Sequence, residues 1–116
     1  MEAMIITKNS MVVVNGNTSR RANVIARRTN SNVMGVVKAQ LIDVLKAKLS
    51  SGVAHFIYAK KDGTLREAWG TTSHNLMKAN INGRGVSRDR VNCVAYWDCE
   101  KGGIRSLRFE NLVQVF

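Results

Sequence analysis

The sequence predicts a mainly β protein, in which one N-terminal amphipathic helix precedes a small five-stranded barrel. Three observations support this fold class. Apolar residues recur at helical spacing between residues 33 and 50. From residue 53 onward the period falls to two, and short alternating runs are separated by turns that contain glycine. All the aromatic residues lie after residue 55, so we expect the dense core in the second half of the chain.

The first 30 residues are expected to form a basic N-terminal arm, followed by a helix-plus-barrel domain over residues 31–116. No acidic residue lies between Glu2 and Asp43. Four arginines of the arm are candidate contacts to a polyanion: Arg20, Arg21, Arg27 and Arg28. A solvated, partly disordered tail is the alternative for such a segment. Asn15-Gly16 also favours a short hairpin turn within the arm.

One amphipathic helix is predicted over residues 33–50. Its apolar stripe consists of residues spaced three and four apart: Met34, Val37, Leu41, Val44, Leu45 and Leu49. Ser31 or Asn30 can cap the beginning of the helix. Ser50-Ser51-Gly52 ends it, and Gly52 is expected to adopt the left-handed conformation.

A β-hairpin is predicted next, with strands over residues 53–60 and 64–71. The turn between them is Lys61-Asp62-Gly63, and Asp-Gly between two alternating runs is a strong signal for a hairpin. The charged residues of this turn are interpreted as turn chemistry and not as a site. The second strand is followed by a loop rich in glycine and arginine, residues 80–90.

Three more strands follow that loop, over residues 91–98, 104–109 and 112–116. The first two are joined by residues 100–103, and Asp98 is expected to organise this turn by accepting hydrogen bonds from backbone amides. Five short strands with such tight turns imply a small closed barrel, because closure removes exposed strand edges.

The strand segments resemble a known family. "KKDGTLREAWGTT", which begins at Lys60, and "YWDCEKGGIRSLRFENLVQV", which begins at Tyr96, are similar to the small SH3-like β-barrel proteins of gut Bacteroidales and their phages. These proteins are grouped with WYL-like domains as an Sm-like barrel family. The resemblance covers residues 53–116 and implies an SH3-like barrel. It implies no catalytic set, and the similarity of WYL domains to ligand- or nucleic-acid-sensing modules is an analogy at the level of the fold.

The charge balance indicates an acidic partner. The chain has 18 Lys+Arg against 8 Asp+Glu, a formal net charge of +10, which favours DNA, RNA or an anionic surface as the partner. Besides the arm, candidate phosphate contacts lie on the loop and the strands: Arg84, Arg88, Arg90, Arg66, Arg105 and Arg108. Tyr96 and Trp97 are expected to point to opposite faces of their strand, so Trp97 is a candidate for base stacking, with a place in the core as the alternative.

Catalysis, a metal and a cofactor are not expected. No nucleophile, base and orienting group can be assembled from the sequence. His55 is interpreted as a histidine satisfied within the barrel. The possible zinc ligands Cys93, Cys99, His55 and His74 lack the usual paired spacings. Cys93 and Cys99 would lie roughly 20 Å apart on a strand, too far for a disulfide.

The sequence therefore predicts a non-catalytic nucleic-acid-binding protein, regulatory or accessory, from a bacterial mobile element or phage. A cytoplasmic setting follows from the unpaired cysteines and from the lack of an apolar run of membrane-spanning length. Two alternatives stay open. One is a structural protein that assembles into a homo-oligomer, and the other is a sensor of a small phosphate-bearing ligand.

Overall fold

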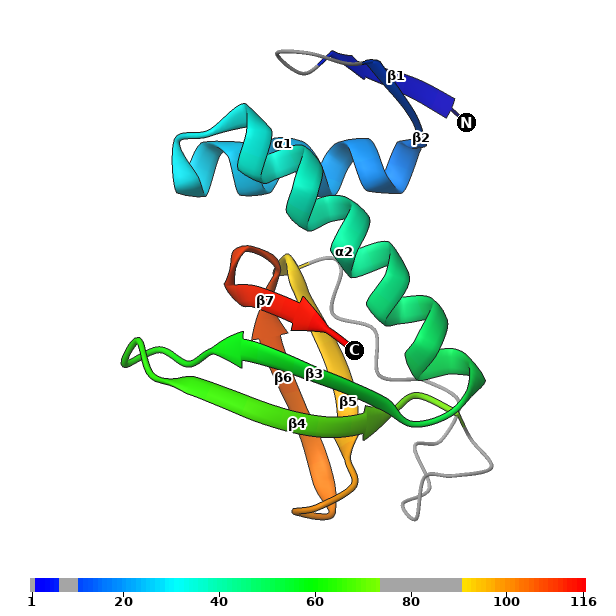
Figure 1. Cartoon of the computed structure of the whole chain (residues 1–116), viewed down its shortest axis with the longest axis vertical. Helices are drawn as coiled ribbons and strands as arrows, with labels where there is room; N and C mark the ends of the chain where they lie inside the picture. Colours follow the sequence, from blue (N-terminus) through cyan, green and yellow to red (C-terminus); the bar gives the residue numbers. More distant parts are fainter. Residues whose placement is uncertain (1, 7–10, 74–90) are drawn as a thin grey trace.

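The structure of the protein is a computed structural model that describes residues 2–6, 11–73 and 91–116. The chain folds in the order β1 (Glu2–Ile6), β2 (Met11–Asn15), α1 (Gly16–Thr29), α2 (Asn32–Ser51), β3 (Ala54–Ala59), β4 (Leu65–Thr71), β5 (Cys93–Asp98), β6 (Gly103–Arg108), the 3-10 helix η2 (Phe109–Asn111) and β7 (Leu112–Val115). The two helices cross above a curved sheet, and the β1–β2 hairpin lies beyond α1 (Figure 1). Within the described residues, no helix has both the length and the apolar character that a membrane crossing requires.

Helix α1 corrects the prediction of a single helix. Gly16–Thr29, which we placed in the basic arm, is helical and contributes Ala22, Val24 and Ile25 to the hydrophobic core. Asn15 ends β2 and Gly16 begins α1, so this dipeptide is not the turn of a hairpin. The sequence pattern failed here because two inward-facing positions of α1, Thr18 and Arg21, are polar.

Asp43 of α2 explains how these polar residues are buried. The Thr18 hydroxyl donates to Asp43 Oδ2 at 2.6 Å, and Arg21 Nη1 donates to Asp43 Oδ1 at 3.0 Å. Buried polar groups are tolerated when they are hydrogen-bonded in this way. A polar contact between the helices thus takes the place of an apolar stripe on α1.

Helix α2 confirms the predicted helix with nearly the same bounds. The predicted apolar stripe is wrong in part, because Met34, Val37 and Val44 are exposed. The positions that face the core instead are Val36, Ala39 and Ile42.

Ser31 is the N-cap of α2, and the Ser31 hydroxyl accepts from the Met34 amide at 3.2 Å. Gly52 follows the helix but has φ 171°, so the expected left-handed conformation is wrong. Helix α2 carries Ile42, Leu45 and Leu49 into the core against the sheet.

Gly35 allows the two helices to approach closely. A Cβ atom at Gly35 would collide with the Ala22 carbonyl oxygen of α1 and lie 3.0 Å from the Ala26 Cβ atom. We expect Gly35→Ala to lower the free energy of unfolding by about 1–2 kcal/mol, because overpacking outweighs the gain in helix propensity of about 1 kcal/mol. Denaturant unfolding measures this effect. Gly103→Ala is the matched control, since a Cβ atom there has nothing within 4 Å; an equal loss in both variants would contradict the prediction.

The five predicted strands all form, in one antiparallel sheet with the order β6-β5-β4-β3-β7. The prediction of a closed barrel is wrong. Strands β6 and β7 lie at the two edges of the sheet, and no pairing between them is present among the described residues. The short helix η2 turns the chain after β6 so that β7 pairs with β3 instead. An open edge strand can also be protected from pairing with another chain by charged side chains. Strand β6 carries two exposed arginines, Arg105 and Arg108.

The core lies between the helices and one face of this sheet. Phe56, Tyr96 and Phe109 are completely buried, and the Phe56 and Tyr96 rings meet edge to face with centroids 5.0 Å apart. Burial alternates along β3, as expected for a strand with one face on the core. This packing fixes the positions of β4, β5 and β6, which each contribute residues to a surface groove.

Candidate nucleic-acid interface

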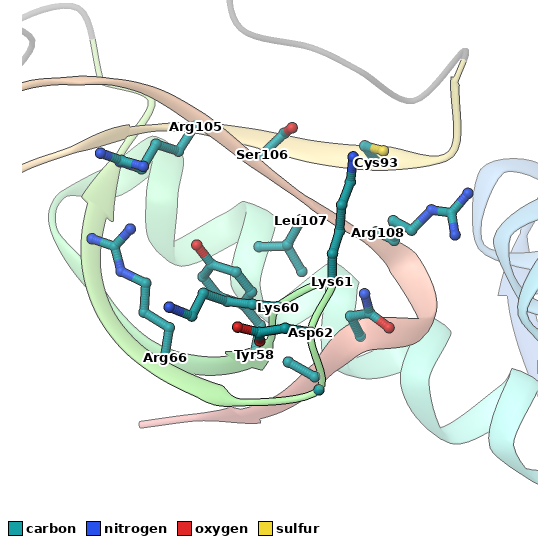
Figure 2. A pocket seen from close by; sticks show the side chains of 13 residues that line it. Tyr58, Lys60, Lys61, Asp62, Arg66, Cys93, Arg105, Ser106, Leu107 and Arg108 are labelled. Carbon is teal, nitrogen blue, oxygen red and sulfur yellow. The ribbon is translucent and has the colours of Figure 1, made fainter.

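A groove of about 1100 Å³ lies between the β3–β4 turn and strand β6 (Figure 2). Five basic side chains line it, two from the turn, one from β4 and two from β6: Lys60, Lys61, Arg66, Arg105 and Arg108. The other lining residues are Tyr58, Ala59, Asp62, Gly63, Cys93, Ser106, Leu107 and Asn111. The groove is therefore strongly cationic, and Asp62 is the one carboxylate among its described lining residues.

The β3–β4 turn holds the two lysines at the rim of the groove. Gly63 adopts φ 86°, which few residues other than glycine accept. Asp62 Oδ1 accepts from the Thr64 amide at 2.9 Å and from the Thr64 hydroxyl at 2.6 Å. These two hydrogen bonds, that of the hydroxyl first, lower the pKa of Asp62. The predicted turn is confirmed, and it also fixes where Lys60 and Lys61 leave the backbone.

A buried carboxylate, Asp98, organises the arginines on the other side of the groove. Its side chain is 0% exposed, Arg66 Nη2 donates to Asp98 Oδ2, and Arg105 Nε lies 3.3 Å from the same oxygen. The amides of Glu100 and Lys101 each donate to Asp98 Oδ1 at 2.9 Å. The predicted role of Asp98 in this turn is thus confirmed, and its contact with two arginines is a structural finding.

The charge of Asp98 is maintained by these donors. Burial acts to raise the pKa of Asp98, but the Lys101 amide, the Arg66 guanidinium and the Glu100 amide together outweigh it, so the pKa lies below its ordinary value. One carboxylate between two guanidinium groups leaves a net positive charge. Arg66 and Arg105 are therefore fixed in position with cationic charge remaining for a ligand.

Two tyrosines form a neutral polar contact beneath the groove. The hydroxyls of Tyr58 and Tyr96 are 2.9 Å apart, and both side chains are buried. Burial first, and then the hydrogen bond with Tyr58, raise the pKa of Tyr96 far above its ordinary value. Because Tyr96 stays protonated, no phenolate there offsets the cations that line the groove.

The four arginines of α1 have different environments. Arg21 is 6% exposed and bonded to Asp43, so its predicted role as a phosphate contact is corrected to a structural one. Arg28 pairs with Glu110 at 2.7 Å. Arg20 and Arg27 are exposed and line a second hollow of about 650 Å³. Of the predicted arm contacts, these two retain an accessible guanidinium beside a concavity.

Trp97 and the loop arginines have different outcomes. Tyr96 and Trp97 were predicted to point to opposite faces of their strand, one of them open. Instead both are buried: Trp97 is 8% exposed and Tyr96 is completely buried. Trp97 offers no exposed ring for base stacking, and this prediction is corrected. Arg84, Arg88 and Arg90 lie outside the described residues, so their role stays a prediction.

His55 has aromatic neighbours on both sides. Its ring stacks between Trp69 and Phe116, with centroids 4.4 Å and 4.2 Å away, and His55 Nε2 lies 2.9 Å from Glu67 Oε2. These contacts agree with the interpretation of His55 as a satisfied histidine in the sheet. No disulfide joins Cys93 and Cys99.

Sequence reasoning missed the lysines of the groove. Lys60 and Lys61 were interpreted only as part of a turn, although they lie opposite β6 (Figure 2). Their charge was visible in the sequence, but the position of β6 across the groove from them was not. It depends on the order of strands in the sheet.

Comparison with known proteins assigns the fold. A family model described as "WYL_2, Sm-like SH3 beta-barrel fold" matches residues 42–113, more than half of the chain. The chain belongs to the WYL_2 family. The matched segment of this WYL_2 protein includes every lining residue of the groove, whereas α1 lies outside it. The predicted resemblance to an Sm-like, SH3-like barrel family is confirmed, and its link to Bacteroidales stays a prediction.

One curated relative comes from a phage. The WYL_2 chain is 28% identical over 81 residues to a protein of Enterobacteria phage T4 named "Uncharacterized 11.5 kDa protein in Gp31-cd intergenic region". The alignment covers 67% of this chain and 79% of the phage protein. No solved structure matches the chain significantly.

Proposed function

We propose that this WYL_2 protein binds nucleic acid without catalysing a reaction, and that it serves as an accessory or regulatory protein of a phage or another bacterial mobile element. The observation that carries the proposal is the groove, where five basic side chains converge from three separate segments. The relative from phage T4 supports the biological setting. The cytoplasmic location belongs to the same proposal.

The chemistry of the groove suits phosphate groups. Lysine ammonium and arginine guanidinium groups bind phosphate oxygens by charge-assisted hydrogen bonds, and arginine can do so through two parallel bonds. Asp62, the carboxylate at the rim, already accepts two hydrogen bonds within its own turn. A polyanion entering the groove therefore meets excess positive charge that the protein has arranged before binding. Such contacts supply affinity without reading base sequence.

A salt titration tests this proposal. Labelled single-stranded and double-stranded DNA and RNA are titrated with the protein. We expect the fluorescence anisotropy of at least one of them to increase on binding, with affinity that falls steeply as salt rises. Each phosphate contact contributes about 0.7–0.9 to the slope of log affinity against log salt. Five contacts from the groove would give a slope of about −3.5 to −4.5. No binding to any of these ligands at low salt would reject the proposal.

A sensor of a small phosphate-bearing ligand is the second candidate. The observation that favours it is the pair Arg66 and Arg105, which Asp98 holds on one wall of a concave site. Tight stoichiometric binding of a free nucleotide, measured by calorimetry, with weak binding of polynucleotides would support this candidate over the first. The homo-oligomer alternative would use the outer edges of β6 and β7, which pair with no further strand in the part of the chain that the structure describes. Sedimentation of the protein without ligand tests it.

A further inference from the structure

We propose that the bound polymer leaves the groove past Arg108 and continues along helix α1, so that the ligand is an extended single strand. This inference rests on the proposed function, because it takes the groove as the first part of a longer binding surface. It adds a second contact region, the hollow lined by Arg20 and Arg27, and it names the class of nucleic acid.

The two regions meet at Asn92. Arg108 lies at one end of β6, where it is the register partner of Cys93 in β5. The residue before Cys93, Asn92, accepts a hydrogen bond from Arg20 Nη1 of α1 at 2.8 Å. Arg108 extends away from the centre of the groove toward the helices (Figure 2). The basic lining of the groove is thus adjacent to the basic face of α1.

The α1 region has the composition of a phosphate-binding surface. Its hollow is lined by two arginines, three asparagines and two apolar residues: Arg20, Arg27, Asn23, Asn30, Asn32, Val24 and Ala26. Arg20 and Arg27 are seven residues apart, two helical turns, so they lie on one face about 10 Å apart along the axis. Asparagine amides donate hydrogen bonds without adding negative charge.

Glu110 is a carboxylate beside the junction, two residues after Arg108, and its charge is already compensated. Arg28 Nη1 donates to Glu110 Oε1 at 2.7 Å, and Arg108 Nη1 lies 3.8 Å from Glu110 Oε2. Among the described residues that line the two hollows, Asp62 is the one carboxylate, and it already accepts two hydrogen bonds within its own turn. A polyanion passing from Arg108 to Arg20 therefore meets no uncompensated negative charge on these linings.

The dimensions favour a single strand. A space of about 1100 Å³ is about 10 Å across if its dimensions are equal, which is narrower than even the major groove of B-DNA, about 12 Å wide. A single strand therefore fits this space better than a duplex does. From Arg105 to Arg108, strand β6 extends about 10 Å, and from Arg20 to Arg27, helix α1 extends about 10 Å more. Together these segments span about 20 Å, which a strand of several nucleotides can cover.

The test compares short and long oligonucleotides on the full chain. Labelled thymidine strands of about 4 and about 16 nucleotides are titrated by anisotropy over a salt series. Arg27→Gln is expected to reduce the salt slope for the long strand by about 0.7 and to leave the short strand unchanged. Arg105→Gln, in the groove, is expected to weaken both. Lys101→Gln is the control, because Lys101 is also exposed and lies in the β5–β6 turn, beside the end of β6 opposite Arg108.

The possible results distinguish failure of this inference from failure of the proposed function. If Arg27→Gln matches Lys101→Gln on the long strand while Arg105→Gln weakens binding, the α1 region is rejected and the groove stands. If a duplex of the same length binds as tightly as the long strand, the single-strand inference is overturned. If the wild-type protein binds a duplex but neither strand, this inference fails and the proposed function stands. If it binds no DNA or RNA at low salt, both fail.

Discussion

Asp98→Ala is expected to lower the free energy of unfolding by about 3 kcal/mol. Removing one partner of a buried ion pair costs about 3–5 kcal/mol, because the other charge is left uncompensated. The lower end applies here, since the side chain of Arg66 keeps 15% of its surface exposed and that of Arg105 keeps 46%. The variant also loses the acceptor for the amides of Glu100 and Lys101. Urea unfolding followed by circular dichroism measures the effect.

Two further variants separate the charge from the turn. Asp98→Asn retains an oxygen that can accept from the turn amides but removes the charge that pairs with Arg66, so its loss should be smaller than that of Asp98→Ala. Asp62→Asn is the matched control, because Asp62 accepts from a turn in the same way but is exposed. A loss for Asp62→Asn as large as that for Asp98→Asn would contradict the special role of the buried carboxylate.

The contribution of the Asp98 charge depends on pH in a defined direction. The pKa of Asp98 is lower in the folded protein than in the unfolded chain, where it is about 3.9. The contribution of the Asp98 charge to the free energy of unfolding is therefore fully present above about pH 4 and is lost as pH falls through the folded-state pKa of Asp98. The stabilities of wild type and Asp98→Asn are expected to approach each other below about pH 4. A constant difference across that range would show that the charge is not responsible.

The triple variant Lys60→Gln, Lys61→Gln, Arg108→Gln is expected to bind nucleic acid with a much weaker dependence on salt. These three side chains are exposed, and their loss leaves the contacts of Arg66 and Arg105 with Asp98 in place. Three lost phosphate contacts reduce the magnitude of the slope by about 2–3. Between 50 and 200 mM salt, the wild type should then lose about 20- to 40-fold more affinity than the variant does. Anisotropy titrations at several salt concentrations measure both slopes.

A second triple variant tests whether location matters or only net charge. Lys46→Gln, Lys48→Gln, Lys101→Gln removes the same charge from α2 and from the β5–β6 turn, outside the groove lining. It is expected to reduce the slope by less than half as much. An equal reduction in both triple variants would mean that the protein attracts nucleic acid through its overall charge and that the groove is not the site.

Local patterns in the sequence were sufficient to predict α2 and all five strands of the sheet. Hydrophobic period and turn chemistry act over a few residues, and the hairpin around Asp62-Gly63 and the turn after Asp98 formed as expected. The pattern was not sufficient for α1, because its inward face includes Thr18 and Arg21. These residues are stable there because Asp43, more than twenty residues away, accepts their hydrogen bonds.

The site was predicted by residue type but not by arrangement. Arg66, Arg105 and Arg108 were named from the sequence as phosphate contacts, and the structure brings them together. Arg21 and Trp97 were also named, yet both are buried. Charge and aromatic character can be read from single residues, whereas exposure depends on what packs against them.

The sequence by itself determined the type and bounds of most elements, the turns that join them and the large excess of positive charge. Only the tertiary structure decided that the sheet stays open between β6 and β7, that Lys60 and Lys61 lie across a groove from β6, and that Asp98 holds Arg66 and Arg105 together. The physical reason is range. Helices, strands and turns depend on neighbours within a few residues, but strand order and the pairing of buried charges depend on contacts between residues about 30 positions or more apart, such as Arg66 and Asp98.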